Sequence, residues 1–168
     1  MGRGRRPLPA MYRKPKVRNF PILIPSLTER NRTSMRKKQE KEITIFYCTH
    51  QGERVTQILK GVNGSGMLKV RKVALPCSGK LEVFQLTRAL ENGADGVALF
   101  GCPEGECRYV VGSSRAKGRV SYAGKILGAI GLEKERVRRF VLESQPSQET
   151  LKAISDWVEK VRTMGSIP

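Results

Sequence analysis

The sequence predicts an α/β fold with a four-stranded parallel sheet and flanking helices, preceded by an extended basic N-terminal arm. From residue 42 onward, short β-branched or apolar runs alternate four times with longer runs whose apolar residues recur at helical spacing. Alternating strands and helices are typical of a parallel sheet that is covered by helices. The length of 168 residues fits one domain with its own core beside the arm.

The first half of this alternation contains two strands and two helices. Residues 42–48 are rich in β-branched and aromatic side chains, which indicates a strand, and residues 68–75 alternate like a strand until a proline follows. Residues 52–62 and 81–91 carry apolar side chains at helical spacing. Gly93 is a stop signal for the second of these helices.

The second half repeats the same order. Residues 96–100 are wholly apolar, which suits a strand in the buried middle of a parallel sheet. Residues 113–130 are predicted to form a long helix that begins at a serine cap. Residues 137–142 form the fourth predicted strand, and the last helix, 147–164, carries Trp157 on its apolar face.

The first 41 residues differ from the rest in charge and proline content. The formal net charge of the chain is +17, and residues 1–41 contain 13 Lys and Arg but only two Glu. Prolines interrupt helices and central strands, and the five in this segment are Pro7, Pro9, Pro15, Pro21 and Pro25. We therefore expect a basic, proline-containing extended arm over 1–41 and an α/β domain over 42–168. The arm is expected to order on a partner, with the apolar segment 20–24 as an anchor.

No apolar run in the sequence approaches the length of a membrane span or of a secretory signal core. Arg5 and Arg6 are not followed by an apolar run, which disfavours a twin-arginine signal. The sequence thus predicts a cytoplasmic protein with no membrane span. Thiols stay reduced in that compartment, so the cysteines are expected to be ligands or nucleophiles rather than disulfides.

The cysteines are the most informative residues, and there are four: Cys48, Cys77, Cys102 and Cys107. Cys48 ends the first predicted strand, Cys77 follows the second and Cys102 follows the third. The carboxyl ends of parallel strands share one edge, where open α/β sheets bind ligands. Cys107 lies in a glycine-containing loop just after Cys102, and this loop can fold back. We therefore predict that the four thiols converge on one metal or cofactor site.

Four thiolates suit an iron–sulfur cluster or a tetrahedral zinc ion. Structural zinc sites usually combine two close ligand pairs, whereas only Cys102 and Cys107 are close here, with four residues between them. The spacing favours the cluster, and a zinc-stabilised adaptor is the alternative. A third interpretation is that all four are ordinary buried thiols, because free cysteine is often a small core residue.

Other classes of function have less support. A single histidine, His50, argues against most catalytic triads, so we predict no catalytic residue and no substrate turnover by this chain alone. The basic arm could bind nucleic acid. However, Tyr12 and Phe20 are its only aromatic side chains, so base stacking would be sparse. A nucleic-acid-binding function would also leave the cysteines unexplained.

Residues 42–144 resemble the delta subunit family of methyl-viologen-reducing hydrogenases. The resemblance rests on four segments in the same order: CSG at 77–79, ENGADGV at 91–97, GCxxGxCxY at 101–109 and IGLExER at 130–136. It implies a [2Fe-2S] cluster on the four cysteines. It also implies an electron-transfer subunit that connects a hydrogenase or formate dehydrogenase-type donor to a flavin-containing heterodisulfide reductase-like subunit.

One position departs from the family pattern. The family usually has C-x2-C at the end of the first strand, and Gln51 stands here in place of the second cysteine. Five cysteines are one more than a four-coordinate cluster needs, so the four present suffice. His50 could substitute as an imidazole ligand, or it could be a solvated loop residue.

The backbone N–H groups around Gly79, Gly101 and Gly105 are candidate hydrogen-bond donors to the sulfurs.

Overall fold

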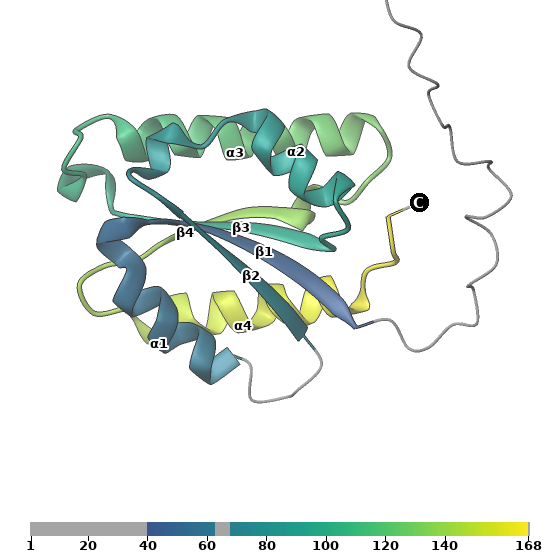
Figure 1. Cartoon of the computed structure of the whole chain (residues 1–168), viewed down its shortest axis with the longest axis horizontal. Coiled ribbons are helices and arrows are strands. Elements are labelled where there is room, and N and C mark those ends of the chain that lie inside the picture. Colours follow the sequence, from purple (N-terminus) through teal and green to yellow (C-terminus); the bar gives the residue numbers. More distant parts are fainter. Residues whose placement is uncertain (1–39, 63–67, 168) are drawn as a thin grey trace, which may run out of the picture. The chain divides into compact units, whose positions relative to one another are not determined.

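The computed structural model describes residues 40–62 and 68–167. The chain divides into two units, Met1–Lys37 and Lys38–Pro168. The predicted arm lies outside the described residues except for Glu40 and Lys41. The strands and longer helices of the second unit (Figure 1) are, in chain order, β1 (Lys41–Cys48), α1 (Gly52–Val62), β2 (Leu68–Leu75), α2 (Val83–Glu91), β3 (Gly96–Gly101), α3 (Gly112–Ala129), β4 (Val137–Val141) and α4 (Gln148–Thr163).

The four strands form one parallel sheet in the order β2-β1-β3-β4, which confirms the predicted architecture. Strand β2 pairs with one edge of β1, and β3 pairs with the other edge. The carboxyl ends of β1 and β3 therefore flank a topological switch point, the usual position of a ligand site in an open α/β sheet. The register aligns these two ends, because Tyr47 lies opposite Phe100.

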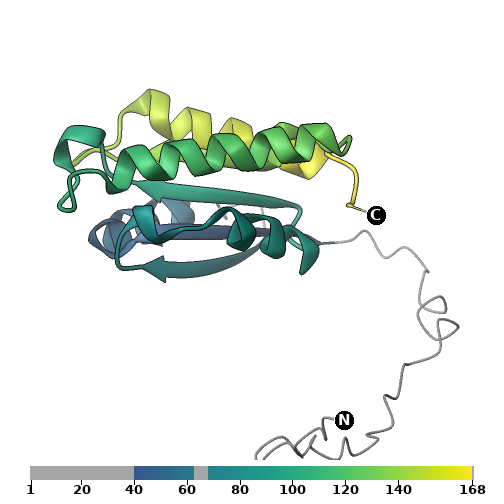
Figure 2. The same ribbon diagram turned by 90° about the horizontal axis from the view of Figure 1, so that it is seen from above.

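Helices cover both faces of the sheet, with α1 and α4 on one face and α2 and α3 on the other (Figure 1). Figure 2 shows that α3 and α4 lie on the side of the sheet away from β2, and both helices contact β4. In β1, Ile43 and Ile45 pack with side chains of α1 and α4, whereas Phe46 packs with those of α2 and α3. All six residues of β3 are buried, as expected of a central strand with helices on both faces.

The start of α2 lies two residues later than predicted. Glu82 is the N-cap, and its side chain and that of Gln85 form a reciprocal capping box. Leu81 lies before the helix and is fully buried in the core between the sheet, α2 and α3. Its apolar character therefore reflects tertiary burial rather than a place on the helix.

The start of α3 corrects another expectation. The N-cap is Val111, whose side chain makes no capping hydrogen bond. The predicted serine cap is wrong, because the Ser113 hydroxyl donates to the carbonyl of Cys102 instead. The first N–H groups of α3 therefore have no side-chain cap and can serve other acceptors.

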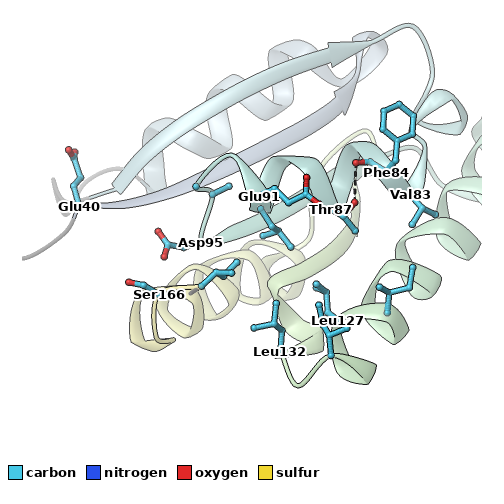
Figure 3. Close-up of a pocket in the computed structure, with 15 residues that line it drawn as sticks. Glu40, Val83, Phe84, Thr87, Glu91, Asp95, Leu127, Leu132 and Ser166 are labelled. Atoms are coloured by element: carbon cyan, nitrogen blue, oxygen red, sulfur yellow. Dashed lines mark hydrogen bonds between the residues drawn. The ribbon is translucent and has the colours of Figure 1, made fainter. Parts of the chain in front are cut away.

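A cavity of about 950 Å³ lies at the amino end of the sheet, between α2, the end of α3 and the C-terminal residues (Figure 3). Its lining among the described residues is mainly apolar, with Val83, Leu127 and Leu132, and includes no cysteine or histidine. Glu91 and Asp95 also line this cavity. It is thus at the opposite end of the sheet from the cysteines. Within the described ranges, no helix is long and apolar enough to cross a bilayer.

Candidate metal centre

All four predicted ligands lie at the carboxyl edge of the sheet. Cys48 is the last residue of β1, Cys102 directly follows β3, Cys77 lies two residues after β2, and Cys107 lies in the loop before α3. All four side chains are buried and unbridged. Four residues that are far apart in sequence therefore share one edge of the fold.

The structure brings these thiols together as two pairs. Cys48 and Cys102 are neighbours at the switch point between β1 and β3. Cys77 and Cys107 meet around Gly112, the first residue of α3. Among residues 40–62 and 68–167, no three Cys, His, Asp or Glu side chains are grouped so that they could hold a metal ion.

Burial is the main influence on the Cys48 thiol. It raises the pKa of Cys48, because a thiolate loses solvation in the protein interior. The backbone N–H groups of His50 and Ser78 lower this pKa in part, and the neighbouring Cys102 raises it again. The net result is a pKa of Cys48 above the ordinary value of a thiol.

Cys102 accepts a hydrogen bond from the side chain of Gln51. Gln51 Nε2 lies 3.3 Å from Cys102 Sγ, and the glutamine is only 3% exposed. Arg54 Nη1 donates to Gln51 Oε1 over 2.7 Å. A guanidinium has only donors, so the amide oxygen must face Arg54 and the amide N–H must face the sulfur. Gln51, which sequence reasoning treated only as a missing cysteine, is therefore a fixed donor to one of the four sulfurs.

The second pair is surrounded by backbone N–H groups. Gly79 N–H donates to Cys77 Sγ over 3.4 Å. Burial alone would raise the pKa of Cys107, but the N–H groups of Tyr109, Ser113 and Gly112 lower it below its ordinary value, with help from Cys77. Two of these N–H groups belong to the first turn of α3, where the helix dipole also favours negative charge.

Two glycines allow the sulfurs of Cys77 and Cys107 to lie close to the start of α3. A Cβ atom on Gly112 would lie 2.4 Å from Cys77 Sγ and 3.1 Å from Cys107 Sγ. A Cβ atom on Gly79 would lie 2.6 Å from the Gly112 Cα atom. Any larger residue at either position would have to displace sulfur or backbone atoms. The helix start and the turn after β2 therefore fit together only because both residues lack a side chain.

The turn after β2 and the first turn of α3 each contact both pairs of cysteines. Ser78 directs its N–H toward Cys48 and directly follows Cys77. Ser113 directs its N–H toward Cys107 and its hydroxyl toward the Cys102 carbonyl. Four buried, unbridged thiols with nearby N–H donors fit an iron–sulfur cluster in ligand number and chemistry, and they also match a zinc site. Coordination of a single centre by all four stays a prediction.

The other candidate residues have different roles. His50 is exposed, and its Nε2 atom lies 3.5 Å from Arg108 Nη1, at the surface of the site. Gly79 is confirmed as a donor to sulfur. At Gly101 the structure shows instead a close approach to Ser78, whose hydroxyl would lie 3.3 Å from an added Cβ. Gly105 is exposed.

Comparison with known proteins gives a family match. The sequence profile of the methyl-viologen-reducing hydrogenase delta subunit matches residues 43–165. The match therefore includes nearly all of the α/β domain, with its four cysteines, and leaves out the basic N-terminal segment.

Several curated proteins are similar to this chain. The iron-sulfur subunit of the vhu F420-non-reducing hydrogenase of Methanocaldococcus jannaschii is 32% identical over 127 residues, which is 75% of this chain and 95% of that protein. The iron-sulfur subunit of the F420-non-reducing hydrogenase of Archaeoglobus profundus is also 32% identical, over 73% of this chain and 88% of that protein.

A relative of another kind is much longer. It is one of the subunits of the ferredoxin:CoB-CoM heterodisulfide reductase of Methanosarcina mazei. This protein is 30% identical over 98 residues, which is 58% of this chain but only 12% of the reductase polypeptide. A segment similar to this chain therefore forms a small part of a larger protein.

Proposed function

Because the chain belongs to the methyl-viologen-reducing hydrogenase delta subunit family, we propose that it is an electron-transfer subunit with a [2Fe-2S] cluster. Its ligands are Cys48, Cys77, Cys102 and Cys107. The observation that supports the proposal is the placement of four buried, unbridged thiols, as two pairs, at the carboxyl edge of one sheet. Relatives that match along nearly their whole length are named as iron-sulfur subunits.

The residues around the thiols would hold such a cluster and influence its reduction potential. When bound, a cluster of this kind supplies one-electron chemistry, and its potential depends on hydrogen bonds, charge and exposure at the sulfurs. Gln51 N–H stabilises negative charge at Cys102, and the α3 N-terminus does so at Cys107. All four side chains are at most 9% exposed, which limits contact of the sulfurs with water.

The proposed partners follow from the relatives. The iron-sulfur subunits from Methanocaldococcus jannaschii and Archaeoglobus profundus carry hydrogenase names, which supports a hydrogenase-type electron donor, and a formate dehydrogenase could serve in the same way. The reductase polypeptide from Methanosarcina mazei contains a segment similar to this chain. This shared segment supports a heterodisulfide reductase-like protein, which we propose to be flavin-containing, as the acceptor. A reducing cytoplasm would keep the four thiols unbridged.

The ligand assignment is tested by replacing each cysteine with alanine in the full-length chain purified without oxygen. Iron and acid-labile sulfide are measured per chain. We expect each of the four variants to lose most of its iron and sulfide, because three thiolates leave one iron coordination site open. His50→Ala is the matched control, and it should keep wild-type iron content. Unchanged iron in any cysteine variant would remove that residue from the ligand set, and iron loss in His50→Ala would assign the imidazole instead.

A further inference from the structure

An exposed apolar turn lies directly beside the Cys77–Cys107 pair. It consists of Tyr109, Val110 and Val111, whose side chains are 54%, 77% and 45% exposed. We call these three residues the apolar lip. It follows Cys107 after one residue and ends where α3 begins. Large apolar side chains that are clustered and solvent-exposed often mark a contact surface for another protein.

The backbone of the lip is strained. Val110 has φ of 55°, and it is the one residue other than glycine with positive φ in the part of the chain that the structure describes. A β-branched residue in this region is a steric outlier. The Val111 N–H donates to the Tyr109 carbonyl over 2.6 Å and closes a three-residue turn around Val110. The strain brings no core burial, since Val110 points into solvent.

Strained, exposed residues persist mainly where they serve a function. Here the turn holds an apolar side chain outward, close to two of the four thiols. Tyr109 and Val111 also line a recess of about 410 Å³ whose wall includes Cys77. A partner that covers the lip would therefore come close to that sulfur.

The surroundings of the lip are mainly cationic. Lys80 and Arg115 line the recess, are not buried and form no ion pair with another described residue. Arg108 directly precedes Tyr109 and contacts only the His50 ring among the described polar groups. Glu106 is the one exposed carboxylate next to this group that has no ion pair within the described ranges. An apolar centre with a basic rim is complementary to a partner surface with an apolar centre and carboxylates around it.

We propose that the apolar lip, with Lys80, Arg108 and Arg115, is the docking surface for a redox partner with an acidic face. The proposal rests on the proposed function, because it places the partner's own cofactor next to the Cys77–Cys107 side of the cluster. Tyr109 is the one aromatic side chain of the lip, and the two valines are aliphatic and offer no stacking platform for bases. Nucleic acid therefore fits this surface less well than a protein does.

The surface is tested by hydroxyl-radical footprinting of the full-length chain, free and in the complex that it forms in its own cells. Tyr109 and Tyr122 form a matched pair, with 54% and 58% exposure. We expect oxidation of Tyr109 to fall several-fold in the complex while oxidation of Tyr122, on α3, does not change. Equal oxidation of Tyr109 in both samples would overturn the proposal. The proposal would also be overturned if the chain were recovered from its cells without a protein partner, that is, alone, as an assembly of its own copies, or bound only to nucleic acid.

Two substitutions test the same surface by affinity. Val110→Gly removes the exposed side chain and relieves the strained φ. We therefore expect its binding to the partner, from which the native chain has been removed, to weaken about tenfold. The thermal midpoint of the free chain should be unchanged or higher. Arg115→Glu should slow association and reduce its salt dependence, whereas Lys125→Glu, another reversal of an exposed charge on α3, should leave both unchanged. Equal effects at 115 and 125 would contradict a defined docking face.

Iron and sulfide analysis of the same samples separates this proposal from the function on which it rests. A Val110→Gly variant that keeps wild-type iron and sulfide but loses affinity supports the docking surface. A variant that loses the cluster would overturn it, because the lip would then be part of the cluster site itself. Protection of Tyr109 in a complex whose wild-type chain holds no iron would support docking and contradict the cluster.

Discussion

The two cysteine pairs share one edge of the sheet but differ in what stabilises their sulfurs. The Cys48–Cys102 pair lies at the switch point, where burial raises the pKa of Cys48 and a side chain, Gln51, donates to Cys102. The Cys77–Cys107 pair lies at the start of α3, where backbone N–H groups lower the pKa of Cys107. The pKa of Cys48 is thus raised and that of Cys107 is lowered relative to an ordinary thiol.

Because of this difference, substitutions in the surrounding protein should affect the two pairs differently. The first pair depends mainly on burial and on the Gln51 side chain, so it can be adjusted by single substitutions. The second pair depends on the backbone of α3 and on two glycines, so it is sensitive to any change in packing. It also lies beside the exposed apolar lip, and we therefore regard it as the side that faces a partner.

The largest effect is expected at Gly112. Gly112→Ala would place a methyl group 2.4 Å from Cys77 Sγ and 3.1 Å from Cys107 Sγ. Overpacking of this kind typically costs about 1–3 kcal/mol, and here the displaced atoms are the sulfurs themselves. We expect loss of most iron and sulfide, together with a lower thermal midpoint. Metal analysis and thermal unfolding measure the two effects.

Gly118→Ala in the same helix is the control for that substitution. Apart from its chain neighbours and the backbone of its own helix, no described atom lies within 4 Å of its added Cβ, and glycine inside a helix is about 0.5–1 kcal/mol less favourable than alanine. This variant should keep its iron and unfold at a slightly higher temperature. If Gly112→Ala behaved like Gly118→Ala, the close packing of the second pair would be irrelevant to the site.

The next effect concerns the reactivity of the metal-free chain. The pKa of Cys107 is lowered and that of Cys48 is raised, and only the thiolate is alkylated. As the pH falls from alkaline values, alkylation of Cys48 should therefore decline first, and Cys107 should keep reacting to lower pH. Iodoacetamide labelling followed by peptide mass spectrometry gives both pH profiles. Coincident profiles, or the reverse order, would contradict the difference between the pairs.

A smaller effect is expected at Gln51, because one hydrogen bond to sulfur is changed and typically contributes about 1 kcal/mol. Gln51→Leu removes the donor, which should lower the reduction potential, since the reduced state carries more negative charge on the sulfurs. Gln51→Glu keeps the shape but replaces the donor with a carboxylate, so the potential should fall at least as far. Titration followed by electron paramagnetic resonance measures these shifts.

Arg54→Met is the matched positioning test for Gln51. It leaves the glutamine in place but removes the guanidinium that holds Gln51 Oε1 at 2.7 Å. We expect a shift in the same direction as for Gln51→Leu, but smaller. An unchanged potential in all three variants would show that the Gln51 amide does not influence the centre.

Much of the fold could be predicted from the sequence, because each element has a local pattern. The wholly apolar run at 96–100 became the buried central strand β3, and the strand ends were placed at one edge with their cysteines. The strand order was not predicted, since periodicity within one segment does not specify its neighbour in the sheet. The boundary of α3 was predicted within one residue, but its serine cap was wrong because the Ser113 hydroxyl is used by Cys102.

The finer features of the site depend on contacts between distant segments. Gln51 meets Cys102 only because β1 and β3 are neighbours. The spacing of Gln51 and Arg54, one helical turn apart, is a local signal that could have indicated their pairing. The apolar run at 109–111 would ordinarily be assigned to the core, and its exposure follows from the tight turn at Val110.

The most direct test of the central claim is the iron, zinc and acid-labile sulfide content of the anaerobically purified chain, with an electron paramagnetic resonance spectrum after dithionite reduction. The account predicts about two iron and two sulfide per chain and the signal of a reduced [2Fe-2S] cluster. One zinc per chain without sulfide would contradict it, and the four thiols would then form the site of a zinc-stabilised adaptor.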